Sequence, residues 1–182
     1  MKGPASVGGR ERARLFCALR LPDAVLDTIE AWGSEHLAER IVRRSNLHIT
    51  LAFLGHRPVE ELEAIGAATR EAAAASGPIL LEPVGYRETR SVGMLVLSDL
   101  AGTATRLARD LFGRLERLRV YEREKRLWLP HLTVVRFRER PRLQPPLPEL
   151  GEVMPSDAAV FLSRLRPSGA EYFVVDSFAL GG

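Results

Sequence analysis

The chain alternates between two patterns of hydrophobic and polar positions. Apolar residues at every second position are typical of strands buried on one face, and apolar residues three or four positions apart are typical of amphipathic helices. The first pattern predicts strands at residues 14–22, 46–55, 79–88, 93–100, 128–137, 158–167 and 171–180, and the second predicts helices at residues 23–40, 58–76 and 101–118. A turn at Ser168 and Gly169 separates the last two strands and predicts a closing hairpin.

The order of these elements repeats, since each half of the chain runs from a strand through a helix to a strand that contains a histidine. Phe16 precedes His48 by 32 positions, and Leu95 precedes His131 by 36 positions. Such internal similarity predicts two related lobes, each a small sheet with helices outside. No change in composition marks a linker. The lobes are therefore expected to form a single domain at residues 14–182, preceded by a flexible tail at residues 1–13.

The two histidine strands, NLHITLAFLG and WLPHLTVVRF, share a His-x-Thr pattern. Side chains alternate between the two faces of a strand. The opposite face from the core is therefore predicted to hold His48, Thr50 and Ala52 in the first strand and His131 and Thr133 in the second. The core face of the first strand is predicted to hold Leu47, Ile49, Leu51 and Phe53. If the lobes pair, two imidazoles and two hydroxyls converge on one cleft.

Composition and charge narrow the class of protein. A hydrophobic content of 46% and a charged content of 27% are ordinary for a globular domain, and every apolar run is far shorter than the ~20 residues that span a bilayer. The single cysteine, Cys17, permits no internal disulfide, and the N-terminal segment lacks the apolar centre of a secretion signal. A cytoplasmic protein without membrane attachment is expected. The net charge is +3, and arginine supplies nearly all of the positive charge. A basic surface fits a phosphate-bearing partner, although arginines along helices often form only a solvated surface.

A cleft of this kind can catalyse a displacement at phosphorus. One histidine can take a proton from the nucleophile while the other gives a proton to the leaving oxygen, because the imidazole pKa lies near neutral pH. Threonine hydroxyls can donate to the phosphate oxygens. The chemistry requires no metal or other cofactor. A single His-x-Thr is a weak signal, since a histidine on a sheet face is usually structural, but two in matched strands favour catalysis. His36 and His56 lack this context and are expected on the surface.

Four segments, RLFCALRLP, NLHITLAFLG, PHLTVVRF and SGAEYFVVDSFAL, resemble in this order the two-histidine (2H) phosphoesterases. Within that superfamily they are most similar to the RNA 2′,3′-cyclic phosphodiesterases, also called 2′-5′ RNA ligases. The resemblance extends from Arg14 to Leu180 and implies an α+β fold of two lobes related by a pseudo-twofold axis, with two antiparallel sheets flanking a central groove and helices outside. It also implies hydrolysis of the 2′,3′-cyclic phosphate of RNA or of small cyclic nucleotides to a 2′-phosphomonoester. A monomer is expected, although the sequence itself carries no signal for or against a dimer.

The resemblance also implies roles for individual residues. His48 corresponds to the general acid that protonates the departing 3′ oxygen, and His131 to the general base that activates water. Thr50 and Thr133 correspond to residues that bind the phosphate oxygens, and Arg136 to a charged clamp on the phosphate.

Arg136 does not follow from the strand pattern, because strict alternation directs it into the core. A bulge near Val135 would return it to the groove, and a structural ion pair is the alternative. Phe16 and Trp128 are candidates for stacking on a base, with core packing an equal alternative for Phe16. Three positions depart from the pattern expected of the family, in ways that concern substrate contacts: Cys17, Met94 and Leu129.

Other functions remain open from the sequence. Within the enzymes, these are ligation of RNA ends through a 2′-5′ linkage and hydrolysis of another cyclic ester, such as an ADP-ribose cyclic phosphate. In a different class, a non-catalytic RNA-binding module would hold phosphate in the same groove. A purely structural role would leave the two histidines in separate environments.

Overall fold

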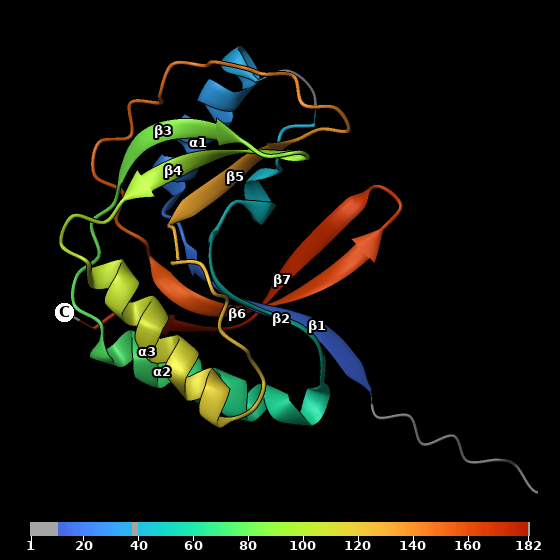
Figure 1. The fold of residues 1–182 in the computed structure, drawn as a ribbon, viewed down its shortest axis with the longest axis vertical. Helices are drawn as coiled ribbons and strands as arrows, with labels where there is room; N and C mark the ends of the chain where they lie inside the picture. The colour runs from blue at the N-terminus through green and yellow to red at the C-terminus, as the bar shows by residue number, and fades with distance from the viewer. Residues whose placement is uncertain (1–10, 38–39, 182) are drawn as a thin grey trace, which may run out of the picture.

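The computed structural model describes residues 11–37 and 40–181 and contains two antiparallel sheets in this part of the chain (Figure 1). The four-stranded sheet has the order β2-β1-β6-β7, formed by Ile49–Pro58, Arg12–Arg20, Asp157–Arg166 and Gly169–Ala179. The three-stranded sheet has the order β3-β4-β5, formed by Glu82–Glu88, Val92–Ser98 and His131–Arg136. The helices are α1 (Asp23–His36), α2 (Leu62–Ala75) and α3 (Thr103–Arg117), with short 3₁₀ turns η1 (Arg44–Asn46) and η2 (Val59–Glu61).

The predicted elements are present, with different boundaries. β1 begins at Arg12, so Arg12 and Ala13 belong to the sheet and not to the predicted tail, and residues 1–10 of that tail lie outside the described residues. Helix α1 ends at His36. β2 continues past Gly55 to Pro58, because Gly55 adopts a positive φ of 68° that lets the strand bend instead of ending.

The two halves of the chain are interleaved in space. β1 and β2 of the first half pair with the C-terminal hairpin β6–β7. Helices α2 and α3 pack on each other, α2 lies against β6 and β7, and α3 contacts β2. Helix α1 lies instead beside the three-stranded sheet (Figure 1), where Gly33 approaches Ile41, which forms a β-bridge to Val135 of β5. Each sheet therefore depends on elements from both halves.

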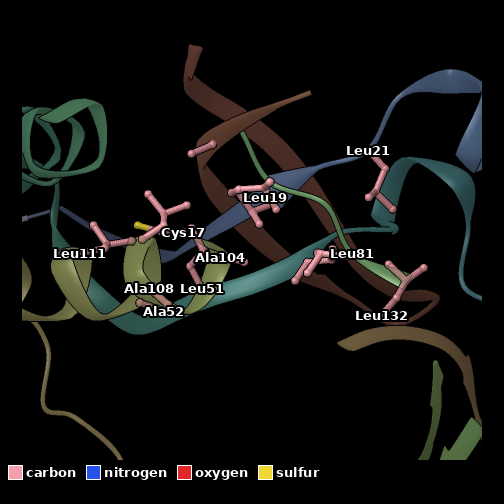
Figure 2. Close-up of a cluster of buried hydrophobic side chains, with 14 of the residues drawn as sticks. Cys17, Leu19, Leu21, Leu51, Ala52, Leu81, Ala104, Ala108, Leu111 and Leu132 are labelled. Atoms are coloured by element: carbon pink, nitrogen blue, oxygen red, sulfur yellow. The ribbon is translucent and has the colours of Figure 1, made fainter. Parts of the chain in front are cut away.

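A continuous hydrophobic core connects the two sheets and the helices (Figure 2). Ala104 and Ala108 of α3 lie close to Leu51 and Ala52 of β2, where small side chains allow the helix to approach the sheet. Cys17, at a position where an aromatic residue is common in the family, is fully buried here and its sulfur lies 3.5 Å from the Thr69 hydroxyl. Burial raises the pKa of the Cys17 thiol to about 11, so this cysteine is an unreactive core residue.

The proline-rich segment after β5 is held by a buried carboxylate. The side chain of Glu88 accepts hydrogen bonds from the backbone N–H groups of Arg142 and Leu143, at 2.9 and 2.8 Å. At the other end of the segment, the Trp32 indole N–H donates to the Pro146 carbonyl at 2.7 Å. These contacts attach the segment to the three-stranded sheet and to α1.

Candidate active site

A β-bulge in β5, directly after the second His-x-Thr motif, changes which of the following side chains face the core. In the pairing with β4, Met94 lies opposite Thr133 and Gly93 lies opposite Val135, so Val134 is an extra residue. Val134 and Val135 are consequently both buried, and Arg136 is exposed and lines a cleft. The close packing at Gly93 fits this irregularity, since a Cβ atom there would lie 2.6 Å from the Val135 side chain and 2.1 Å from the Tyr86 hydroxyl.

β2 is bulged at the equivalent point of the first motif. Ala18 pairs with Thr50 and Cys17 pairs with Ala52, which makes Leu51 an extra residue, and a second irregularity follows at Leu54. The prediction for the faces of this strand is correct for the residues up to Leu51 and wrong beyond it. Ala52 is buried in the core, whereas Phe53 is 48% exposed and lines the cleft. The physical reason is the bulge, which reverses the alternation of side chains.

The two motifs meet at a cleft of about 540 Å³. His48, Thr50 and Phe53 enter it from the first motif, and Thr133 and Arg136 enter it from the second. Three further arginines line the cleft, and these are Arg14, Arg40 and Arg43. None of the lining residues in the described part of the chain is acidic. No sequence pattern singled out these arginines. The cleft therefore offers hydroxyls, an imidazole and concentrated positive charge, which suit an anionic ligand.

The His48 ring is fixed in orientation by two hydrogen bonds. Its Nδ1 donates to the carbonyl oxygen of Asn46 at 2.7 Å, and its Nε2 lies 2.9 Å from the Thr50 hydroxyl. Because the carbonyl can only accept, Nδ1 carries the proton, and in the neutral ring Nε2 accepts from Thr50. The ring rests on Phe16, at 4.8 Å between centroids, and against the edge of Tyr172, at 5.4 Å.

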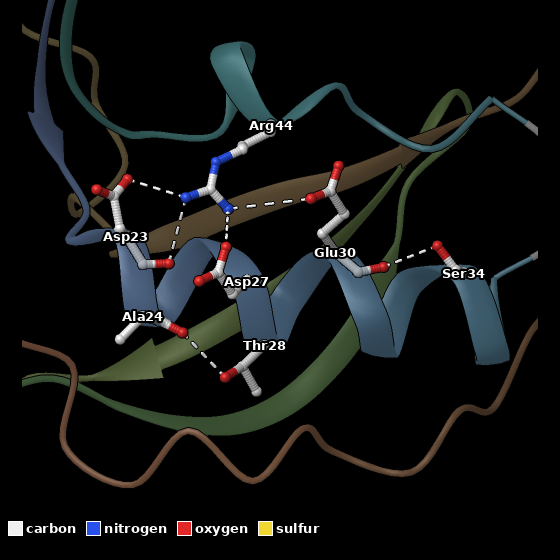
Figure 3. A network of polar contacts seen from close by, with 7 residues as sticks. All are labelled: Asp23, Ala24, Asp27, Thr28, Glu30, Ser34 and Arg44. Carbon is white, nitrogen blue, oxygen red and sulfur yellow. Dashed lines mark hydrogen bonds and ion pairs between the residues drawn. The ribbon is translucent and has the colours of Figure 1, made fainter.

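The turn η1, which supplies the Asn46 carbonyl, is anchored on both sides. Arg44 makes an ion pair with Asp23 of α1 at 2.9 Å and another with Asp27 (Figure 3). The Asn46 side-chain amide donates to the carbonyl of Ala170 in β7 at 2.8 Å. These contacts hold the turn between helix α1 and the C-terminal hairpin, and so support the position of His48.

The environment of His48 favours its neutral form in the empty cleft. Burial lowers the pKa of His48 from its ordinary value of 6.5 to about 4, and the charges of His131 and Arg136 act in the same direction. The hydrogen bond to the Asn46 carbonyl raises the pKa, but its effect is smaller than that of burial. The influence of His131 and Arg136 places both residues within electrostatic reach of His48.

His131 repeats the orientation of His48. Its Nδ1 donates to the carbonyl of Leu129 at 2.8 Å, two residues earlier, as Asn46 lies two residues before His48. The ring is partly exposed on the same face of β5 as Thr133. In both motifs a carbonyl thus fixes the Nδ1–H tautomer and leaves Nε2 for chemistry.

Neither of the two predicted stacking residues presents a free ring face to the cleft. Phe16 borders the cleft but is only 3% exposed, because one face of its ring stacks on Phe161 at 4.9 Å and His48 covers it on another side. The prediction that Phe16 stacks on a base is therefore corrected to core packing beneath His48. Trp128 does not line the cleft, and its indole N–H donates to the Thr50 carbonyl at 3.0 Å, which ties the second motif to the first.

The other two histidines, and Met94 among the departures from the family pattern, lie outside the cleft lining. His56 is exposed after the bend at Gly55, and His36 is half-buried in the last turn of α1 beside Glu35. Met94 pairs with Thr133 in the sheet register and is nearly buried. Within the described residues, no group of three or more histidine, cysteine, aspartate or glutamate side chains is arranged to hold a metal ion. None of the helices described is both long and apolar enough to cross a membrane.

Two antiparallel sheets around a cleft built from paired His-x-Thr motifs define a phosphoesterase fold, and comparisons with known proteins agree. A family model described as LigT-like phosphoesterase matches residues 19–91, which include the first motif. The protein TT0787 of Thermus thermophilus is 31% identical, with a TM-score of 0.77 over 93% of this chain and 98% of TT0787. The chain belongs to the LigT-like phosphoesterases of the 2H superfamily, and the predicted bilobal fold is confirmed.

The E. coli protein LigT shows the same fold at lower identity. LigT in complex with 3′-AMP is 23% identical, with a TM-score of 0.78 over 94% of this chain and 100% of LigT. LigT in complex with phosphate is also 23% identical, with a TM-score of 0.75 over 94% of this chain and 99% of LigT. A search among curated proteins found no significant match.

Proposed function

We propose that this phosphoesterase hydrolyses the 2′,3′-cyclic phosphate of RNA or of small cyclic nucleotides to a 2′-phosphomonoester, and that it acts in the cytoplasm as a monomer. The observation that carries the proposal is a single cleft that His48 and Thr50 of the first motif share with Thr133 and Arg136 of the second, with four arginines and, among the residues described, no carboxylate in its lining. His131 is not among the lining residues, but it lies on the same face of β5 as Thr133 and within electrostatic reach of His48. An imidazole pair and an anion-binding wall are the groups that hydrolysis of a phosphodiester uses. The relative LigT binds 3′-AMP and phosphate, which supports a nucleotide phosphate as ligand.

The proposed reaction is a displacement at phosphorus. His131 Nε2 takes a proton from a water molecule, and the water oxygen forms a bond to phosphorus while the bond from phosphorus to the 3′ oxygen breaks. His48 Nε2 gives its proton to the departing 3′ oxygen, so the product carries a 2′-phosphate and a free 3′-hydroxyl. Thr50, Thr133 and Arg136 would donate to the non-bridging oxygens, where negative charge is stabilised.

If His48 is the general acid, its ring must be protonated when the substrate is bound. In the empty cleft its ring is neutral, because burial lowers its pKa to about 4. His48 must therefore gain its proton when the anionic substrate enters. A phosphate beside the ring favours the imidazolium form, since an opposite charge within hydrogen-bonding distance raises the pKa of a histidine.

Incubation with adenosine 2′,3′-cyclic phosphate in the presence of EDTA tests the reaction, with chromatographic separation of the 2′- and 3′-monophosphates. The expected product is the 2′-monophosphate. His48→Ala and His131→Ala are expected to abolish turnover with an unchanged circular dichroism spectrum, and Thr50→Ala and Thr133→Ala to lose on the order of a hundredfold in kcat.

The matched control is His56→Ala, since His56 is exposed and lies outside the cleft. Wild-type rates in either catalytic histidine variant would refute the acid and base assignment. Binding of the nucleotide without product formation would favour the RNA-binding module instead. Formation of 2′-5′ linked products from two RNA ends would favour the ligase.

A further inference from the structure

A short segment before the first histidine motif, residues 40–43, pairs with β5 and lines the cleft. Ile41 forms an antiparallel β-bridge with Val135. One position further along β5, the backbone N–H of Arg136 donates to the carbonyl of Arg40 at 3.1 Å. In this register Arg40 lies directly opposite Arg136, so the segment brings a second guanidinium next to the one that is proposed to hold the reacting phosphate.

The placement of these arginines costs stability in the empty cleft. Like charges directly opposite each other on paired strands repel. Arg40 also has a φ of 51°, in the left-handed region that residues with a Cβ atom seldom adopt. Arg43 adds another exposed guanidinium to the cleft, and no carboxylate of the described residues forms an ion pair with Arg40 or Arg43. Strain and unbalanced charge of this kind gather at ligand sites.

The other two arginines of the cleft already have partners or a role. Arg136 faces the phosphate in the proposed reaction, and the Arg14 guanidinium donates to the buried Ser163 hydroxyl at 2.8 Å. A cyclic mononucleotide carries a single negative charge, whereas the cleft lining holds four arginines and, in the described part of the chain, no acidic residue. Arg40 and Arg43 therefore match a ligand with more than one phosphate.

The chemistry of the substrate determines where a second phosphate lies. A 2′,3′-cyclic phosphate occupies both the 2′ and the 3′ oxygen of the terminal ribose, so the molecule can continue only from its 5′ oxygen. In RNA the group at that position is the phosphodiester to the preceding nucleotide. Cβ atoms directly opposite on paired strands are about 5 Å apart. Arg40 and Arg136 are thus close enough for each to hold one of the two phosphates of a single nucleotide.

We propose that Arg40 and Arg43 bind the phosphate on the 5′ side of the reacting nucleotide, and that the substrate is an oligoribonucleotide with a 2′,3′-cyclic end, not a free cyclic mononucleotide. This inference rests on the proposed function for the position of the cyclic phosphate. Guanidinium groups suit the role, because their donors match two phosphate oxygens at once and their charge does not depend on pH. A contact with the backbone phosphate carries no sequence information, so the subsite accepts any base.

The kinetic test compares three substrates: adenosine 2′,3′-cyclic phosphate, its 5′-phosphorylated form, and the dinucleotide ApA with a 2′,3′-cyclic end. In wild type, KM is expected to be on the order of tenfold to a hundredfold lower for the two substrates with a 5′ phosphate group. Arg40→Gln is expected to bring the three KM values together. A wild-type KM ratio in Arg40→Gln would overturn the proposal. A low KM for the 5′-phosphorylated mononucleotide alone would refute an oligoribonucleotide as the substrate.

Arg119 supplies a matched control for the loss of an arginine. It is exposed and has a positive φ of 58°, as Arg40 has, but it does not line the cleft. Arg119→Gln is expected to keep the wild-type KM ratio, and Arg40→Lys is expected to keep part of it, because the charge remains. An equal loss of the ratio in Arg40→Gln and Arg119→Gln would overturn the proposal, since it would indicate an effect of net charge.

Equilibrium titration separates this inference from the proposed reaction. Wild type is expected to bind adenosine 2′,5′-bisphosphate more tightly than adenosine 2′-monophosphate. Its affinity for the bisphosphate should also depend more steeply on salt, by about 0.7 in the slope of log K against log salt for the added phosphate contact. Arg40→Gln is expected to lose both differences.

The two ideas can fail independently. If wild type hydrolyses no cyclic phosphate but shows this binding pattern, the subsite stands and the proposed reaction fails. If wild type binds the bisphosphate no more tightly than the monophosphate, the subsite is refuted whatever the catalytic result.

Discussion

The pKa of His48 gives the sharpest test of the proposed acid. At pH 7 a ring with a pKa of about 4 is protonated in about one molecule in a thousand, so the empty enzyme holds almost no general acid. The decrease from 6.5 corresponds to roughly 3 kcal/mol, at about 1.4 kcal/mol per pH unit. A single negative charge about 4 Å away contributes about 4 kcal/mol at an effective dielectric constant of 20. A bound phosphate is therefore sufficient to return the pKa of His48 to ~6.5 or above.

The measurement is an NMR titration of the histidine ring nitrogens, with the His48 signal assigned by its loss in His48→Gln. Without ligand, His48 is expected to titrate near pH 4. With saturating inorganic phosphate or adenosine 2′-monophosphate, its midpoint is expected to rise by two or more pH units. Adenosine, which carries no phosphate, should leave the midpoint unchanged.

A His48 midpoint that stays near 4 with the phosphate site occupied would refute the reasoning. The ring would then remain neutral in the complex, with Nδ1–H bound to the Asn46 carbonyl and a lone pair on Nε2. Such a ring can accept a proton but cannot donate one to the leaving oxygen at neutral pH. The two histidines would have to exchange roles.

Two further predictions concern stability. Gly93→Ala is expected to destabilise the fold by about 1–3 kcal/mol through overpacking, and to weaken phosphate binding because it moves Arg136. The control is Gly85→Ala on the adjacent strand, which has open space around it and should change neither the unfolding temperature nor phosphate binding. The unfolded chain protonates His48 near pH 6.5 and the folded chain near pH 4, so wild type should lose up to about 3 kcal/mol of unfolding free energy as the pH falls through this window. Urea denaturation at pH 7, 5 and 4 should show a smaller loss in His48→Gln, and parallel curves for the two proteins would contradict the buried, neutral ring.

The order of strands and helices was predictable because hydrophobic periodicity reports local structure. Helix α2 and helix α3 followed directly from apolar spacing, and the hairpin β6–β7 followed from the turn at Ser168 and Gly169. The interleaving of the two halves was not predictable from periodicity. It depends on which apolar faces cover each other, and that choice is made by contacts such as Gly33 with Ile41 between residues in different elements.

The candidate site, like the fold, was predictable from the sequence only in part. The positions of His48 and Thr50 on one face followed from the alternation of strand residues, and so did His131 and Thr133. Asn46, whose carbonyl fixes the His48 tautomer, carries no such signal, because backbone carbonyls are present at every residue. Its effect depends on the anchoring of η1 by Arg44, which only the three-dimensional arrangement reveals (Figure 3).

Phe53 and Arg136 show how one backbone irregularity can serve both halves of a site. Each lies five residues after its histidine, and each reaches the cleft because a bulge three residues after that histidine leaves two consecutive residues buried. Strict alternation places both in the core, yet their equal spacing from the two histidines was a signal available in the sequence. The same geometry brings a guanidinium to the cleft from the second motif and a phenyl ring from the first. A ligand with a charged end and an aromatic end matches this asymmetry, and a symmetric inorganic anion does not.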